Sequence, residues 1–84
     1  MNMMEYIKNR VENLYRTNPS VHVTVNRTHP KITVESSSAI IVGVYKHIFQ
    51  LEDRNGRKQP IRYSFQYGDL LTGQIVIDEL GDTP

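Results

Sequence analysis

The sequence contains no cysteine and no tryptophan among its 84 residues. The absence of cysteine excludes disulfides, thiolate metal ligands and a cysteine nucleophile. No apolar run approaches the roughly 18 residues that a membrane span needs, and the first residues, Met1 to Glu5, lack the basic start and apolar stretch of a signal peptide. The sequence therefore predicts a cytoplasmic protein that does not enter a membrane.

Apolar residues are also scarce, since hydrophobic side chains make up only 38% of the chain. A chain of this length buries only about 60% of the surface of its unfolded state, which leaves little room for a deep substrate cavity. We expect one domain over residues 1–84, with a helix within residues 1–17 and a small β-barrel over residues 21–80.

A helix is predicted at the amino end. Apolar side chains recur there at spacings of three, four and three, which places them on one helical stripe: Met4, Ile7, Val11 and Leu14. Asn2 can cap this helix, with Glu5 three residues later as in a capping box. Asn18-Pro19 ends it, because proline restricts the preceding residue to extended geometry. The helix should run from about Met3 to Arg16.

The rest of the chain has the composition and periodicity of β-strands. Valine and isoleucine number eight each, and alanine one, which favours strands because β-branched side chains pack well on a pleated surface. Extended segments are predicted near residues 21–26, 31–35, 39–44, 48–51 and 61–65, and a sixth, anchored by Ile75 and Ile77, is predicted to end near Leu80. We expect Ser36 to Ser38 to break the second segment from the third, Gly43 to bend the third, and residues 67–71 to form a tight or 3₁₀ turn.

These elements predict a mainly β protein in which an N-terminal α-helix precedes a small five- to six-stranded antiparallel barrel. SH3-like and Sm-like barrels fit the pattern best, and the helix would cover an open end or face. Such a fold implies no single function.

Charge is unevenly distributed along the chain. All ten lysines and arginines lie at or before Arg62, together with five acids, and the other four acids follow. The link from Arg27 to Lys31 and the turn at Lys46 should share one end of the barrel, while the Asn55-Gly56 hairpin should project from the other. Such charges are ordinary for a solvated domain, but they can also contact phosphates if they cluster beside aromatic side chains.

The candidate binding residues are therefore basic and aromatic: Arg27, His29, Lys31, Tyr45, Lys46, Arg54, Arg57, Lys58, Arg62 and Tyr67. For Tyr45 and Tyr67, core packing and an aromatic binding surface are equally compatible with the sequence. Tyr63 is expected in the core, since it alternates with Ile61 and Phe65.

Catalytic and metal-binding motifs are not found in the sequence. His22, His29 and His47 have no paired ligand spacing, so we expect no metal and no cofactor. Asp69 follows Gly68 in the predicted turn and should accept local backbone N–H groups. These patterns do not predict an enzyme.

One stretch carries a family resemblance. Residues 63–72, Tyr-Ser-Phe-Gln-Tyr-Gly-Asp-Leu-Leu-Thr, resemble the tyrosine-rich segment of the Veg family of small Gram-positive bacterial proteins, with matches at Ser64, Tyr67, Asp69, Leu71 and Thr72. Upstream, residues 31–35 and 40–49 resemble its basic Lys-Thr-Ile-Glu segment and its strand–Tyr turn–strand unit. The likeness covers roughly residues 20–80, although Lys46 replaces the family's proline and the basic cluster is reduced to Arg27, His29 and Lys31.

The resemblance implies a helix plus an SH3-like or Sm-like barrel in the cytoplasm, no known enzymatic activity, and a regulatory role linked to biofilm formation. We accordingly expect a non-enzymatic regulatory module that binds a protein. The alternative is a nucleic-acid-binding small barrel that uses its basic loops. A homodimer is also predicted, through the edge strand that contains Pro60 or through the helix.

Overall fold

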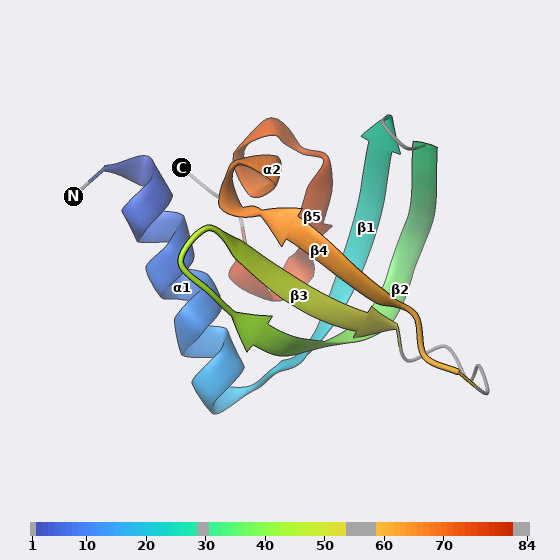
Figure 1. Ribbon diagram of the computed structural model, residues 1–84, viewed down its shortest axis with the longest axis horizontal. Coiled ribbons are helices and arrows are strands. Elements are labelled where there is room, and N and C mark those ends of the chain that lie inside the picture. Colours follow the sequence, from blue (N-terminus) through green and yellow to red (C-terminus); the bar gives the residue numbers. More distant parts are fainter. Residues whose placement is uncertain (1, 29–30, 54–58, 82–84) are drawn as a thin grey trace.

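The computed structural model describes residues 2–28, 31–53 and 59–81, with only the backbone described at residues 27–28 and 31–36. Its elements follow in the order α1 (Met3–Thr17), β1 (Ser20–Thr28), β2 (Lys31–Val44), β3 (Ile48–Asp53), β4 (Arg62–Gln66), α2 (Tyr67–Thr72), β5 (Ile75–Ile77) and the 3₁₀ turn η1 (Asp78–Leu80). Figure 1 shows α1 lying beside a strongly curved sheet, with α2 at the end of β4. Neither helix of these described residues is long and apolar enough to cross a membrane.

Helix α1 confirms the prediction at both of its ends. The Asn2 side chain accepts a hydrogen bond from the Glu5 N–H at 2.8 Å, and the Asn18 N–H donates to the carbonyl of Leu14 at 2.8 Å. Ile7 and Val11 are completely buried, so the predicted stripe anchors the helix to the sheet. Met4, predicted on the same stripe, is instead 46% exposed.

The sheet is antiparallel throughout, with the strand order β4-β3-β2-β1-β5. The prediction that Ser36 to Ser38 would break the chain into two strands is wrong, because β2 is one strand of 14 residues. Val23 pairs with Ser37 and Val25 pairs with Val34, so one extra β2 residue is accommodated opposite Thr24. A bulge of this kind bends a strand without ending it.

The bend predicted at Gly43 is confirmed. The register with β3 shifts between Ile41 and Gly43, which leaves Val42 as an extra residue on β2. These two irregularities in β2 let the sheet curl around a single cluster of buried side chains: Ile7, Val11, Val21, Val23, Val25, Ala39, Ile41, Phe49, Leu51, Phe65, Tyr67, Leu70, Ile75, Ile77 and Leu80.

Barrel closure is not seen in the described strands. β4 and β5 are the two edges of the sheet, and no ladder joins them. The expected helix-then-antiparallel-sheet order is confirmed with five strands, while the short helix α2 gives the chain more helix than a purely β fold.

The predicted tight turn at residues 67–71 is the helix α2, and the 3₁₀ turn comes only after β5. Asp69 explains why a helix forms at this point. Its carboxylate accepts the backbone N–H of Gln66 at 3.0 Å, which caps the amino end of α2 and confirms the expected local role of this residue. Gly73 then ends the helix in the left-handed region, at φ 82°.

The predicted grouping of the basic loops is wrong. Because β2 is a single strand, the link before Lys31 and the turn after Val44 lie at its opposite ends (Figure 1). The hairpin that joins β3 to β4 is confirmed, since the Asp53 N–H donates to the Ile61 carbonyl at 2.8 Å. Glu52 pairs with Arg62, however, whereas a two-residue Asn55-Gly56 turn would set Glu52 opposite Gln59.

An ion pair fastens η1 to β1. The backbone N–H of His22 donates to Glu79 Oε1 at 2.7 Å, and His22 Nδ1 lies 2.7 Å from Glu79 Oε2. The side-chain hydrogen bond and the charge of Glu79 raise the pKa of His22 above 6.5. Burial opposes ionisation of Glu79, but the hydrogen bonds from His22 outweigh it and lower the pKa of Glu79 below 4.5.

This pair predicts a pH window for stability. The contribution of His22 to the free energy of unfolding is complete below pH 6.5 and is lost as the pH rises through the pKa of His22 in the folded state. The contribution of Glu79 is complete above pH 4.5 and is lost as the pH falls through the pKa of Glu79 in the folded state. Urea denaturation should therefore show the largest stability difference between the wild type and Glu79→Gln from pH 4.5 to pH 6.5. The same difference at about pH 8.5 should be smaller; an equal difference at both pH values would contradict the pairing.

Candidate functional site: a groove between helix α1 and the β2–β3 turn

The structure brings together only some of the predicted binding residues. Tyr45 and Lys46 lie together in the β2–β3 turn and are exposed, whereas Arg62 lies on β4 with Glu52 at 3.2 Å. Tyr67 is only 3% exposed, so of the two readings of this residue the core reading holds. The remaining predictions fall outside the described residues, or at positions where only the backbone is described: His29, Arg54, Arg57 and Lys58 in the first case, Arg27 and Lys31 in the second.

The β2–β3 turn, residues 45–47, is held by one backbone hydrogen bond and by the Tyr67 hydroxyl, whose single proton is shared between two carbonyl oxygens. The Tyr45 N–H donates to the Ile48 carbonyl at 2.8 Å. The Tyr67 hydroxyl lies 2.5 Å from the Tyr45 carbonyl oxygen and 3.0 Å from the Ile48 carbonyl oxygen. Burial raises the pKa of Tyr67, so the hydroxyl keeps the proton it donates. The buried Tyr67 side chain therefore fixes the backbone conformation of the exposed β2–β3 turn.

The Tyr45 ring packs against the backbone of β2 at Gly43. A Cβ atom placed on Gly43 would lie 2.6 Å from the Tyr45 ring, closer than any real contact. Glycine at this position thus lets the ring lie close against the strand while 52% of the residue stays exposed. Tyr45 is presented to solvent as an aromatic surface instead of being packed in the core.

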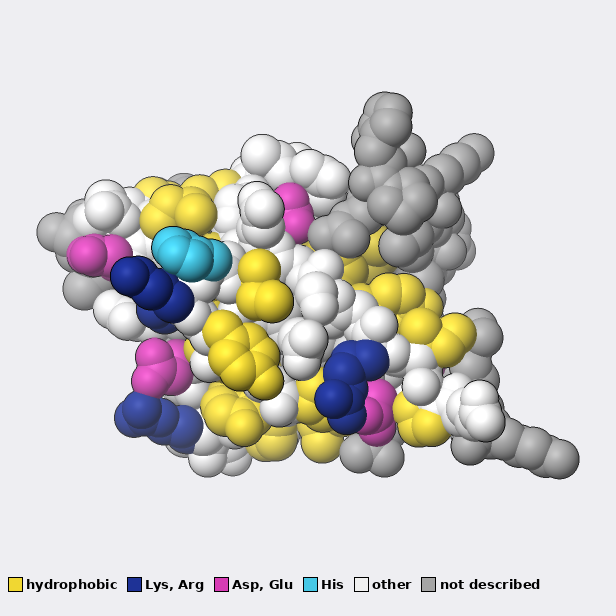
Figure 2. Space-filling model, in the orientation of Figure 1, with side chains coloured by type: hydrophobic (Ala, Val, Ile, Leu, Met, Phe, Trp, Pro, Cys, Tyr) yellow, Lys and Arg dark blue, Asp and Glu magenta, His cyan; other side chains and the backbone are white. Residues whose placement is uncertain are grey.

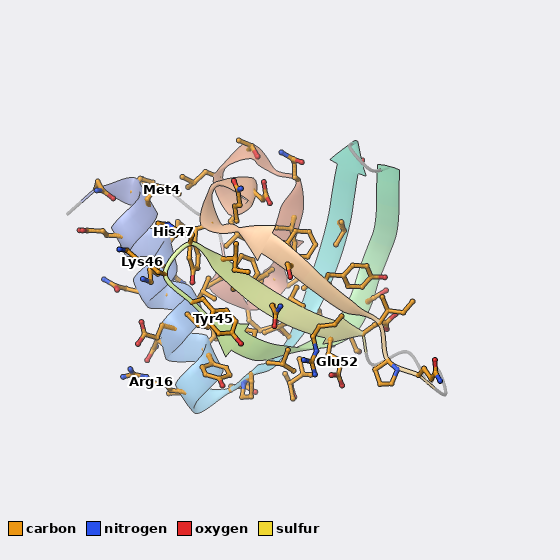
Figure 3. All side chains as sticks on the ribbon, in the orientation of Figure 1. Met4, Arg16, Tyr45, Lys46, His47 and Glu52 are labelled. Carbon is orange, nitrogen blue, oxygen red and sulfur yellow. The ribbon has the colours of Figure 1, made fainter. Side chains whose placement is uncertain are left out.

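A groove runs between α1 and this turn. It consists of two adjoining depressions that share Lys8 and Lys46 on their walls. One depression is lined by Met4 and His47, and the other by Tyr15 and Tyr45. Figure 3 shows the labelled residues in order along α1, from Met4 past His47 and Lys46 to Tyr45 and Arg16. We call this surface the α1 groove, lined by Met4, Lys8, Tyr15, Tyr45, Lys46 and His47.

The α1 groove combines exposed apolar side chains with cations. Met4 is 46% exposed and Tyr15 is 40% exposed, and Figure 2 shows apolar, basic and histidine side chains gathered on this face over α1 and the turn. Arg16 is paired with Glu12 at 2.5 Å. Among the described residues, Lys8 and Lys46 have no ion-pair partner.

Sequence reasoning missed the helix side of this groove. Neither Tyr15 nor Lys8 was among the candidate binding residues. The available signal was an excess of apolar residues on α1, because Met4 and Tyr15 are not needed to fill the core that Ile7 and Val11 form.

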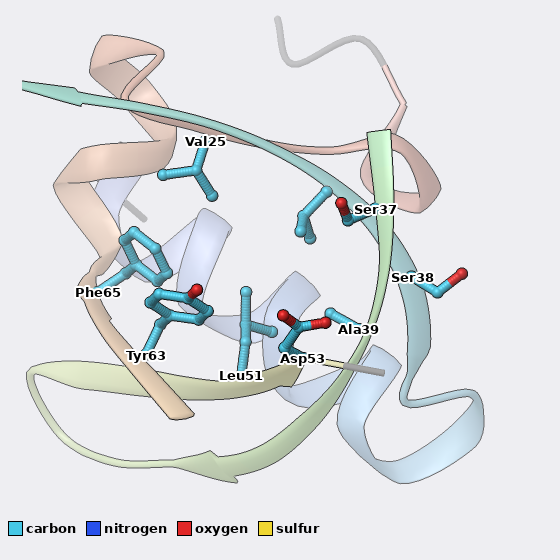
Figure 4. A pocket seen from close by; sticks show the side chains of 9 residues that line it. Val25, Ser37, Ser38, Ala39, Leu51, Asp53, Tyr63 and Phe65 are labelled. Atoms are coloured by element: carbon cyan, nitrogen blue, oxygen red, sulfur yellow. The ribbon is translucent and has the colours of Figure 1, made fainter. Parts of the chain in front are cut away.

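A second, much smaller hollow lies inside the curled sheet and has a cavity volume of about 20 Å³. Figure 4 shows the side chains of Val25, Leu51 and Phe65 around it, with Tyr63 and Asp53 beside them. Its wall is mostly apolar, and its polar side chains are Ser37, Ser38 and Asp53. In the part of the chain that the structure describes, no three His, Asp or Glu side chains are placed to hold a metal ion.

The sequence matches the family described as "Biofilm formation stimulator VEG" over residues 2–78. No curated protein matches the sequence.

Proposed function

The chain belongs to the VEG family of biofilm formation stimulators, and from this membership we propose that it is a non-enzymatic regulatory protein that acts in the cytoplasm by binding a protein partner through the α1 groove. The family is one of regulatory stimulators and is not known for enzymes. The observation that carries the proposal is the row of exposed apolar side chains, Met4, Tyr15 and Tyr45, on one preformed surface.

Apolar groups in such a row favour a protein partner. Exposed tyrosine and methionine are enriched at protein interfaces, where their apolar bodies are buried and their polar ends stay hydrated. The turn is already fixed by Tyr67, so little conformational entropy is lost on its side when a partner binds.

The described cations give less support to nucleic-acid binding through basic loops. Three of the six arginines are engaged within the molecule: Arg10 with the Leu80 carbonyl, Arg16 with Glu12, and Arg62 with Glu52. Glu5 and Glu12 also line the α1 groove, where they would repel a phosphate backbone. The formal net charge of the chain is only +1.

An affinity capture with matched variants tests this proposal. The baits are the wild type, the double variant Tyr45→Ser with Lys46→Ser, and the control Val76→Thr, which alters an exposed residue of β5. Nuclease-treated cytosol should yield a protein that the wild type and the control retain and that the double variant loses about tenfold or more, the scale of an interface hot spot. Capture that disappears with nuclease, or that the double variant keeps, would contradict it.

A further inference from the structure

We propose that the α1 groove, in the role given above, recognises a short acidic segment of its partner that carries one apolar side chain on each side of a central carboxylate. The inference rests on the proposed function and specifies the chemistry of what the groove binds. It follows from the order in which side chains line the groove and from which of them already have partners.

The order along the helix is apolar, basic, apolar. Met4, Lys8 and Tyr15 follow one another at spacings of four and seven residues and so lie along one face of α1. At a rise of about 1.5 Å per residue, Met4 and Tyr15 are separated by about 16 Å along the axis, and Lys8 stands about 6 Å from the Met4 end. An extended peptide rises about 3.3 Å per residue, so about five residues cover this distance.

The basic centre selects a carboxylate. Lys8 from the helix and Lys46 from the turn both line both depressions, and neither has an ion-pair partner among the described side chains. A carboxylate over this point would be contacted by two ammonium groups from two elements. Arg16 is already paired with Glu12 at one end, and Glu5 stands at the other, so neither end favours an acidic residue.

The apolar ends set the positions of the flanking residues. Tyr45 and Tyr15 both line one depression, where an aromatic or leucine side chain could contact both rings. Met4 and His47 line the other depression, where a flexible thioether adapts to a smaller aliphatic side chain. The expected pattern is therefore apolar, any residue, acidic, two of any residue, apolar, read in either chain direction.

The test is a double-mutant cycle by fluorescence anisotropy on the full chain. The probe is the labelled peptide Ser-Leu-Ser-Glu-Ser-Ser-Phe-Ser, run beside its reversed sequence and beside versions with Gln in place of Glu. The Gln peptide should bind about two- to fivefold more weakly than the Glu peptide, and Lys46→Gln should weaken binding of the Glu peptide by no more than that. Lys46→Gln should have no further effect on the Gln peptide, because the carboxylate that Lys46 contacts is already absent. Arg62→Gln, a basic residue outside the groove, should change nothing.

Three results would overturn the inference. The first is equal binding of the Glu and Gln peptides, and the second is strictly multiplicative effects of Lys46→Gln and the Gln peptide. The third is binding of a labelled single-stranded oligonucleotide, but of neither peptide, to the groove. If the Tyr45→Ser, Lys46→Ser double variant still loses the captured protein while the peptides show no carboxylate dependence, only this inference fails. If the double variant keeps the captured protein, the proposed function fails with it.

Discussion

Replacing Phe49 with alanine is expected to lower the free energy of unfolding by about 3 to 5 kcal/mol, the usual cost of removing a buried aromatic ring. Phe49 is 0% exposed and stands at the centre of an aromatic cluster, with its ring centroid 5.9 Å from that of Phe65 and 5.5 Å from that of Tyr67. At about 0.05 to 0.15 kcal/mol per residue, the 84 residues give a total stability of about 4 to 13 kcal/mol, so this loss is a large share of it.

Urea denaturation followed by circular dichroism measures this change. The control is Val76→Ala, which removes apolar atoms from a residue that is 47% exposed and should stay within about 0.5 kcal/mol of the wild type. A loss below about 1.5 kcal/mol for Phe49→Ala would mean that the site collapses around the missing ring and that the aromatic cluster is not the centre of the core.

Removing one oxygen atom from Tyr67 is expected to loosen the α1 groove without emptying the core. Tyr67→Phe keeps the ring against Phe49 but takes the hydroxyl donor from the carbonyls of Tyr45 and Ile48. Leaving partly buried carbonyls without this donor should cost about 1 to 3 kcal/mol. We also expect faster hydrogen exchange at the Tyr45 amide, which bonds within the same turn.

Tyr15→Phe is the matched control, since it removes the hydroxyl of an exposed tyrosine that has no recorded hydrogen bond among the described residues. Its stability and its exchange rates should equal those of the wild type. If Tyr67→Phe were as stable as the wild type and its Tyr45 amide exchanged no faster, the turn would not depend on the core, and the groove would not be preformed.

Local signals in the sequence were enough to predict part of this structure. The cap at Asn2, the proline stop after Asn18, the bend at Gly43 and the capping role of Asp69 each depend on residues within a few positions of one another. Such short-range interactions can be predicted from a sequence because they do not depend on contacts with distant parts of the chain.

The long strand β2 could not be predicted in this way. A run of three serines reads as a turn, yet pairing with β1 continues through Ser37 and Ser38, and the added residue is absorbed as a bulge. Pairing with neighbouring strands overrides a weak local preference. Because two strands were predicted where β2 is one, two basic loops were also predicted at the same end of the barrel.

Only one side of the α1 groove could be predicted from the sequence, because the groove depends on contacts between distant parts of the chain. Tyr45 and Lys46 were chosen as binding residues, but Tyr67 bonds to Tyr45 from 22 positions away and the opposite wall comes from α1. Which tyrosine is core and which is surface depends on that long-range contact. Alternation along the strand does not contain this information.

Photo-crosslinking from position 45 is the most direct test of the central claim, that the α1 groove binds a protein. A photoreactive phenylalanine analogue replaces Tyr45 in one strain and Val76, an exposed β5 residue, in another. Irradiated cells should yield a discrete, nuclease-resistant protein adduct from position 45 that Lys46→Ser weakens, and no such adduct from position 76. A nucleic-acid adduct at position 45, or a protein adduct at position 76 alone, would contradict the account.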